Sequence, residues 1–97
     1  GPGQLKEPFD LAILNAKGGS EGWLFVCEYG TNRVSQFTLA GQFIAVHGGP
    51  GREVGQFYGP RGISVSAESG AIYIADTENH RIQSMELPKL PFGEGLV

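Results

Sequence analysis

The sequence predicts an all-β fold built from short strands and tight turns. Sixteen of the 97 residues are glycine and six are proline, a density of helix breakers that does not suit long helices. The chain is 40% hydrophobic and 18% charged, which supplies enough apolar material for a core and excludes a disordered composition. One pattern also occurs twice along the chain, so the strands are expected to form two units of similar build.

The internal repeat is carried by two sets of matching residues. The segment GWLFVCE at 22–28 matches GAIYIAD at 70–76, and Asn32-Arg33-Val34 matches His80-Arg81-Ile82 at the same offset of 48 residues. Near the start of each copy, Gly-Gln-Leu at 3–5 matches Gly-Gln-Phe at 55–57 at an offset of 52. The first copy therefore has four extra residues, which fall in the polar stretch 15–21, where a surface loop tolerates insertion.

Four strands are expected in the first copy. The first covers residues 9–14, and the second is the apolar run 23–27, which indicates a strand covered on both faces. A third strand of mixed character is expected at 33–39. The fourth, at 42–47, follows a tight turn at Ala40-Gly41, which suits a hairpin.

The second copy repeats the first three strands, at 62–66, 71–75 and 81–87. Ile63 and Val65 alternate with serines, as in a half-buried strand, and 71–75 is expected to be covered on both faces. A fourth strand at 87–92 is broken by two prolines, which confine any pairing there to an edge. Consecutive antiparallel strands, four to a unit of about 50 residues, are typical of β-propeller blades.

This pattern divides the chain into four parts. Residues 1–2 are interpreted as the remnant of a cleavage tag, 3–48 as the first blade, 49–54 as an inter-blade loop, and 55–97 as the second blade with an incomplete or edge fourth strand. The glycine-rich stretch 48–55 is similar to a phosphate-binding loop. No helix with Lys and Ser or Thr follows it, so a flexible connection between blades is expected instead.

The second copy resembles an NHL repeat. The resemblance is carried by Gly-Gln-Phe at 55–57, Pro-Arg-Gly-Ile at 60–63, Ile-Tyr-Ile-Ala-Asp at 72–76 and Asn-His-Arg-Ile-Gln at 79–83, and the first copy resembles it more loosely. The resemblance implies blades of a β-propeller, usually with six blades. It further implies a binding platform for protein or RNA, or less often an enzyme such as the peptidyl-hydroxyglycine amidating lyase.

Two blades alone would leave two apolar faces exposed, and repeat arrays generally need about three or more units. Three arrangements would cover them: a longer propeller of which this is a fragment, a different chain, or further copies of this chain. We expect the last, a cyclic head-to-tail homo-oligomer, with a trimer giving six blades.

Charge and cysteine content limit the kinds of partner and of site that the sequence predicts. The formal net charge is −3, with 7 Lys and Arg against 10 Asp and Glu, so a nucleic-acid partner is not expected. A lone cysteine, Cys27, excludes a disulfide framework or a multi-cysteine zinc site within one chain and is compatible with the cytoplasm. Neither a signal peptide nor a membrane-spanning segment is visible, and the compartment stays open.

Candidate ligand-binding residues lie in the connections between strands. Arg61 precedes the first strand of the second copy, and its counterpart Phe9 shows that the repeat does not demand an arginine there. With Tyr58, Lys6 and Tyr29, Arg61 is expected at one rim of the propeller, where arginine and exposed aromatic side chains hold a protein or peptide. The alternatives are an RNA-binding platform and a lyase or hydrolase with an axial metal. The histidine ligands of the lyases would fall at Phe9 and Arg61, which argues against lyase chemistry.

Other polar residues of the repeat are expected to be structural. Asp76 is expected to accept hydrogen bonds from the turn amides of residues 77–79, and Arg33 and Arg81 to hold a carboxylate or carbonyls of the adjoining blade. The remaining signature residues are Asn32, Asn79 and His80. Cys27 is expected in the core. We expect no catalytic residue, no metal site and no cofactor.

Overall fold

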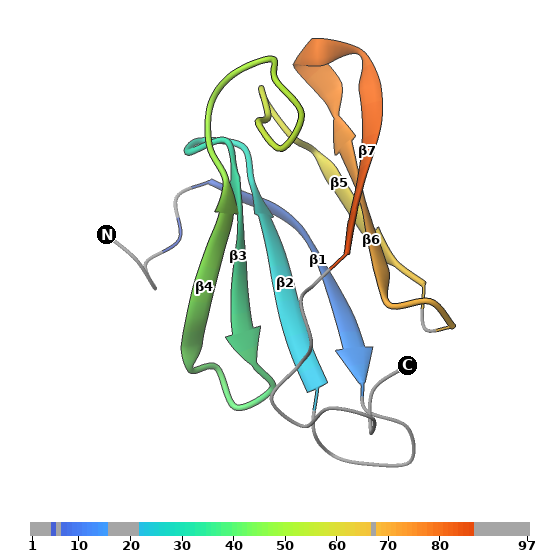
Figure 1. The fold of residues 1–97 in the computed structure, drawn as a ribbon. Helices are drawn as coiled ribbons and strands as arrows, with labels where there is room; N and C mark the ends of the chain where they lie inside the picture. The colour runs from blue at the N-terminus through green and yellow to red at the C-terminus, as the bar shows by residue number, and fades with distance from the viewer. Residues whose placement is uncertain (1–4, 6, 16–21, 67, 87–97) are drawn as a thin grey trace.

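Two antiparallel sheets make up the computed structural model, which describes residues 5, 7–15, 22–66 and 68–86 (Figure 1). The first sheet has the order β1 (Pro8–Asn15), β2 (Gly22–Glu28), β3 (Arg33–Thr38) and β4 (Phe43–Gly48). The second has the order β5 (Gly62–Val65), β6 (Ala71–Asp76) and β7 (Arg81–Glu86), with a 3-10 turn, η1 (Thr77–Asn79), before β7. The seven strands expected over these residues are confirmed. The weak fourth strand at 87–92, the cleavage remnant and Lys6 lie outside the described residues.

Turn geometry explains where the strands begin and end. The β3–β4 hairpin closes on Gly41, whose φ of +92° is accessible to glycine at little cost. The backbone N–H of Gly41 donates to the carbonyl of Thr38 at 2.9 Å. Asn32 and His80, which occupy the same position in the two copies, both have positive φ just before β3 and β7. The repeat seen in the sequence is therefore also a repeat in backbone conformation.

The core lies between the two sheets. In an antiparallel sheet, directly paired residues share a face, so pairing and burial together define which face is covered. The covered face of the first sheet packs against the second sheet, β1 lies beside β5, and Phe57 from the connection joins them. The buried side chains of this core are Leu14, Trp23, Phe25, Cys27, Val34, Phe57, Ile63, Ile72 and Ile74. Burying such side chains stabilises the fold by about 25 cal/mol per Å² of apolar surface.

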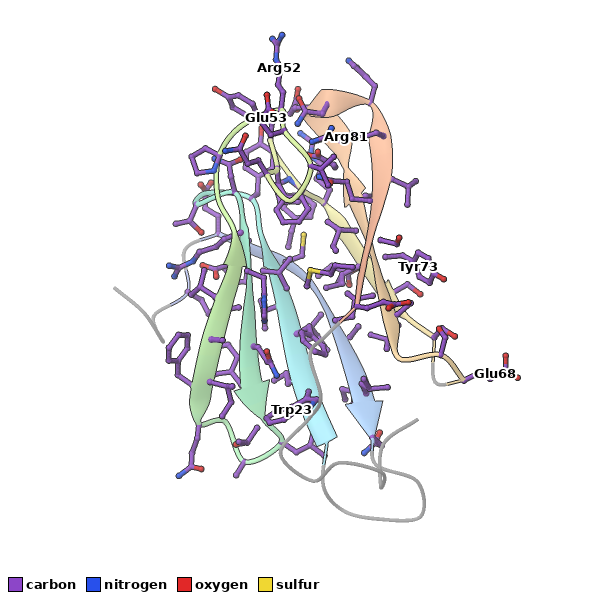
Figure 2. The ribbon with its side chains drawn as sticks, viewed as in Figure 1. Trp23, Arg52, Glu53, Glu68, Tyr73 and Arg81 are labelled. Carbon is purple, nitrogen blue, oxygen red and sulfur yellow. The ribbon has the colours of Figure 1, made fainter. Side chains whose placement is uncertain are left out.

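Burial along the second strands agrees with the sequence in one sheet and differs in the other. In β2 every residue is buried except Leu24, which is half-buried, so the expected burial is found along this central strand. In β6 the prediction is wrong at Tyr73, which is 42% exposed. Figure 2 shows Tyr73 on the side of β6 that is turned away from the first sheet. No other layer of the described residues packs on that side.

The connection between β4 and β5 folds back on itself rather than spanning the sheets as a flexible loop. Phe57 pairs with Pro50 in an isolated parallel bridge. The Phe57 N–H donates to the carbonyl of Gly49 at 2.8 Å, and the Gly51 N–H donates to the carbonyl of Phe57 at 3.1 Å. Gln56 adds a turn bond to Glu53 at 2.9 Å. The connection is thus an ordered element, which places the residues around it at one end of both sheets (Figure 1).

Candidate functional site

The carboxylate of Asp76, at the end of β6, is the centre of a hydrogen-bond network. Asp76 is fully buried and accepts bonds from the Tyr58 N–H at 2.7 Å, Asn79 Nδ2 at 3.0 Å, Arg81 Nε at 2.8 Å and Gln83 Nε2 at 3.2 Å. The expectation that it accepts from the amides of residues 77–79 is wrong, because its side chain does not cap η1. The carboxylate instead faces the connection that precedes β5.

Two opposing effects act on the pKa of Asp76. Burial by itself raises the pKa, since it removes water from the charged form. The hydrogen bonds from Tyr58, Asn79, Arg81 and Gln83 favour the carboxylate and together hold the pKa below its ordinary value. The carboxylate is therefore charged and saturated with donors at neutral pH, which suits a structural role.

Arg81 carries the network from Asp76 to the connection. Its Nη2 donates to the carbonyls of Glu53 and Gln56, each at 3.0 Å, and Figure 2 shows Arg81 beside Glu53. Asn79 Nδ2 reaches the carbonyl of Gly51 at 2.9 Å. Arginine was expected to hold a carboxylate or carbonyls of the adjoining blade. The carboxylate belongs to its own sheet, and the carbonyls belong to the connection.

The first copy places the same residue types in the same arrangement. Glu28, at the end of β2, is fully buried and lies 3.0 Å from Arg33 Nε, and it also accepts hydrogen bonds from Thr31 and Ser35. Asn32 Oδ1 accepts the N–H of Gly59 at 2.7 Å, which joins the β2–β3 turn to the second unit. These signature residues thus fix turns and connections.

A cavity of about 590 Å³ opens at the end of the sheets where these turns meet. The sequence places two candidates there, Tyr29 and Tyr58. It missed the two carboxylates that also line the cavity and the arginine of the connection. The lining residues are Glu7, Tyr29, Gly30, Asn32, Arg52, Tyr58, Gly59, Glu78 and Asn79. We call this cavity the rim cavity.

Arg61 supports the wall of the rim cavity and is not among its lining residues. Its guanidinium carbon lies 5.1 Å from the ring centre of Tyr29 and 5.7 Å from that of Phe9, within the range of a cation–π contact. Its Nη2 is 3.8 Å from Glu78 Oε2, in a pair whose side chains are both about half exposed. Arg61 therefore joins the two units. Of the other predicted ligand-binding residues, Tyr29 and Tyr58 line the cavity, and Lys6 lies outside the described residues.

Gly59 forms part of the rim cavity that sequence reasoning did not single out. Its φ is +58°, and a Cβ built on it would lie 2.5 Å from Glu78 Cγ and 2.9 Å from Tyr29 Cε2. The side chains of Glu78 and Tyr29 thus pack directly against the backbone of Gly59, which leaves no room for a larger residue. The Gly59-Pro60 pair was the available signal, because Gly-Pro marks a turn with special backbone geometry.

The remaining reactive groups lie elsewhere. Burial, followed by the negative charges of Asp10 and Glu28, raises the pKa of the Cys27 thiol to about 12. Burial also lowers the pKa of His47, whose Nε2 is 2.7 Å from Gln36 Oε1. Over residues 5, 7–15, 22–66 and 68–86, no three His, Cys, Asp or Glu side chains group as metal ligands, and no helix is long and apolar enough to cross a membrane.

In a comparison with protein families, residues 57–84 match the NHL repeat model. Residues 57–84 are an NHL repeat. The match spans β5, β6, η1 and β7 and includes the Asp76–Arg81 pair, so the resemblance drawn from the sequence is confirmed there. The NHL repeat and the two antiparallel sheets are consistent with propeller blades and with a β-propeller-type interaction domain. A comparison with curated proteins found no match.

Proposed function

We propose that the chain is a non-enzymatic interaction scaffold, two blades of a six-bladed propeller, that binds a protein or peptide at the rim cavity. The observation that carries this proposal is the rim cavity itself, which brings Tyr29 of the β2–β3 turn together with Arg52 and Tyr58 of the β4–β5 connection. Tyrosine and arginine, together with tryptophan, are enriched among the residues that dominate binding energy at interfaces.

The lining chemistry favours a peptide over a nucleic acid. Among the described lining residues, Glu7 and Glu78 supply two carboxylates and Arg52 one cation, and Asn32 and Asn79 add amide groups. Such a wall accepts hydrogen bonds and positive charge from a ligand, whereas a phosphate backbone needs clustered cations. The net charge of −3 acts in the same direction.

A structural role for the ionisable groups supports a non-enzymatic function. The carboxylates of Asp76 and Glu28 accept several hydrogen bonds each, which satisfies their lone pairs within the fold. Cys27 is buried, and its thiol pKa of about 12 keeps it protonated and unreactive. None of these three side chains lines the rim cavity.

The test is a selection of displayed peptides on the purified chain, followed by affinity measurements on the selected peptide. Tyr58→Ala should weaken that peptide by about tenfold or more, since a central aromatic contact contributes at least about 1.4 kcal/mol. Glu68→Ala, at the far end of the second sheet (Figure 2), should leave the affinity unchanged. Failure to select any peptide, or a selected peptide whose affinity is the same for the wild type and Tyr58→Ala, would contradict the proposal.

The same variants separate this function from RNA binding. Binding of single-stranded RNA that depends strongly on salt and is lost in Tyr58→Ala would identify RNA, instead of a peptide, as the ligand. Completion of the propeller is a separate part of the proposal: the missing blades come from further copies, three chains forming a closed head-to-tail ring. Light scattering that gives a clean monomer at micromolar concentration would contradict this assembly.

A further inference from the structure

Each sheet has one face packed on the other sheet and one face left open. The open face of the first sheet, here named the first open face, carries Leu11, Ile13, Leu24, Val26 and Phe37, which are placed together by strand pairing. Of these side chains, Val26 and Phe37 are buried, Leu24 is half-buried, and the exposed ones are those of β1. Leu11 is 56% and Ile13 52% exposed. Neighbouring apolar side chains this exposed on a sheet indicate a surface that packs against something else.

The repeat shows what kind of surface packs on the first open face. At the two sequence offsets, its residues correspond to residues of the second sheet that are packed on the first sheet. In order, Leu11, Ile13, Leu24, Val26 and Phe37 correspond to Ile63, Val65, Ile72, Ile74 and Met85. The strand pairing is the same in both sheets, Leu11 with Val26 and Ile63 with Ile74. Yet Ile63 is only 8% exposed where Leu11 is 56%.

The open face of the second sheet, here named the second open face, corresponds to the surface that covers Ile63. Its residues Tyr73, Ala75 and Ile82 correspond to Phe25, Cys27 and Val34 of the first sheet, each 0% exposed in the core. Tyr73 is aromatic, as Phe25 is, and Ile82 is β-branched, as Val34 is. The chain therefore presents both halves of the contact that it already makes internally.

We propose that the first open face of one copy docks on the second open face of another, in the same geometry by which the first sheet packs on the second. This inference rests on the proposed self-association and names its two surfaces. Because the surfaces differ, the contact is heterologous, the kind that closes rings when the rotation allows. The occupant is a second copy because the second open face repeats three apolar positions of the surface that covers Ile63, Ile72 and Ile74 within the chain. At the edge of that surface, Ala12, Leu14 and Trp23 have the smaller counterparts Ser64, Ser66 and Ala71.

Two charge substitutions on exposed side chains test the proposal. Leu11→Lys places a charge on the first open face, and Tyr73→Glu places a charge on the second. Each substitution should prevent docking through the face that carries it. Both side chains are about half exposed, so the chain should remain folded, as its circular dichroism would verify. Val54→Lys is the matched control, since Val54 is 93% exposed and belongs to the inter-blade connection. Sedimentation of each variant alone, and of the two in equimolar mixture, is the measurement.

The mixture distinguishes this geometry from other forms of association. Wild type and Val54→Lys should associate, and each face variant alone should be monomeric. The mixture should form a one-to-one dimer, because Leu11→Lys keeps the second open face and Tyr73→Glu keeps the first. Self-association of Tyr73→Glu, or of Leu11→Lys, would overturn the proposed pairing while leaving self-association intact. A monomeric wild type would overturn both, and peptide selection at the rim cavity reports independently on the proposed ligand.

Discussion

The carboxylate of Asp76 accepts a 2.7 Å hydrogen bond from the backbone N–H of Tyr58, 18 residues earlier in the chain. The bond joins the end of β6 to the segment that leads into β5. Tyr58 is thereby held at the rim cavity by the same carboxylate that pairs with Arg81. The architecture of the repeat and the position of its candidate binding residue depend on one side chain.

Removal of that side chain should be costly. Asp76→Ala leaves Arg81, which is 30% exposed, without its carboxylate and the Tyr58 N–H without an acceptor, so we expect a loss of about 3 kcal/mol in the free energy of unfolding. Glu78→Ala is the control: its pair with Arg61 is half exposed at 3.8 Å, which should contribute less than about 1 kcal/mol. Urea denaturation measures both. Equal losses would show that Asp76 does not hold the connection.

The depressed pKa of Asp76 predicts a pH dependence. A carboxyl whose pKa is lower in the folded than in the unfolded state adds stability above the unfolded value, near 3.8, and this stability is lost as the pH falls through the folded value. Wild type should therefore lose more stability than Asp76→Asn between about pH 7 and about pH 3. Urea midpoints at the two pH values provide the comparison. An identical fall in both proteins would contradict the role of this carboxylate.

Cys27 should be unreactive in the folded protein. The rise of its pKa from 9.0 to about 12, caused by burial and by the charges of Asp10 and Glu28, lowers the thiolate population near neutral pH. A shift of this size decreases that population by about a thousandfold, and the 0% exposure of Cys27 blocks reagents as well. Modification by a disulfide reagent should be slow in buffer and fast in urea. Equally fast reaction in both would mean that the core opens readily.

Gly59 and Gly41 form a matched pair for testing contact at the rim cavity. Both have positive φ, so alanine at either position costs about 1 kcal/mol in backbone strain. A Cβ on Gly41 meets nothing within 4 Å, whereas a Cβ on Gly59 meets Glu78 and Tyr29. Gly59→Ala should therefore lose about 1 kcal/mol more than Gly41→Ala in urea denaturation. It should also weaken a rim-binding peptide, an effect that Gly41→Ala should lack.

The strand order was predictable because it depends on local signals. Apolar runs, the turn at Ala40-Gly41 and the matching of the two copies place all seven described strands within a few residues of their observed bounds. The exposed Tyr73 was not predictable in this way. An apolar run of strand length reports that its side chains are suited to burial, and the presence of a second layer depends on what packs there.

The candidate site was predictable in part. Tyr29 and Tyr58 were expected at one rim on account of their connections, and both line the cavity. The partners of Asp76 were not, because the Tyr58 N–H comes from a distant connection, while sequence reasoning favours the nearest amides. Arg52 and Glu7 carried no signal, since a charged residue in a glycine-rich or terminal segment usually faces solvent.

Hydrogen bonds also show which segment would have to be moved as a whole if a blade were transplanted. They run from the side chains of Asn79, Arg81 and Gln83 to the backbone carbonyls of Gly51, Glu53 and Gln56. They tie the end of the repeat to the connection that precedes its first strand. A blade transplanted into another propeller would need its donor's connection from Gly51 onward, although no strand begins there. A graft cut at the start of β5 would separate donors from acceptors and leave Arg81 facing foreign carbonyls.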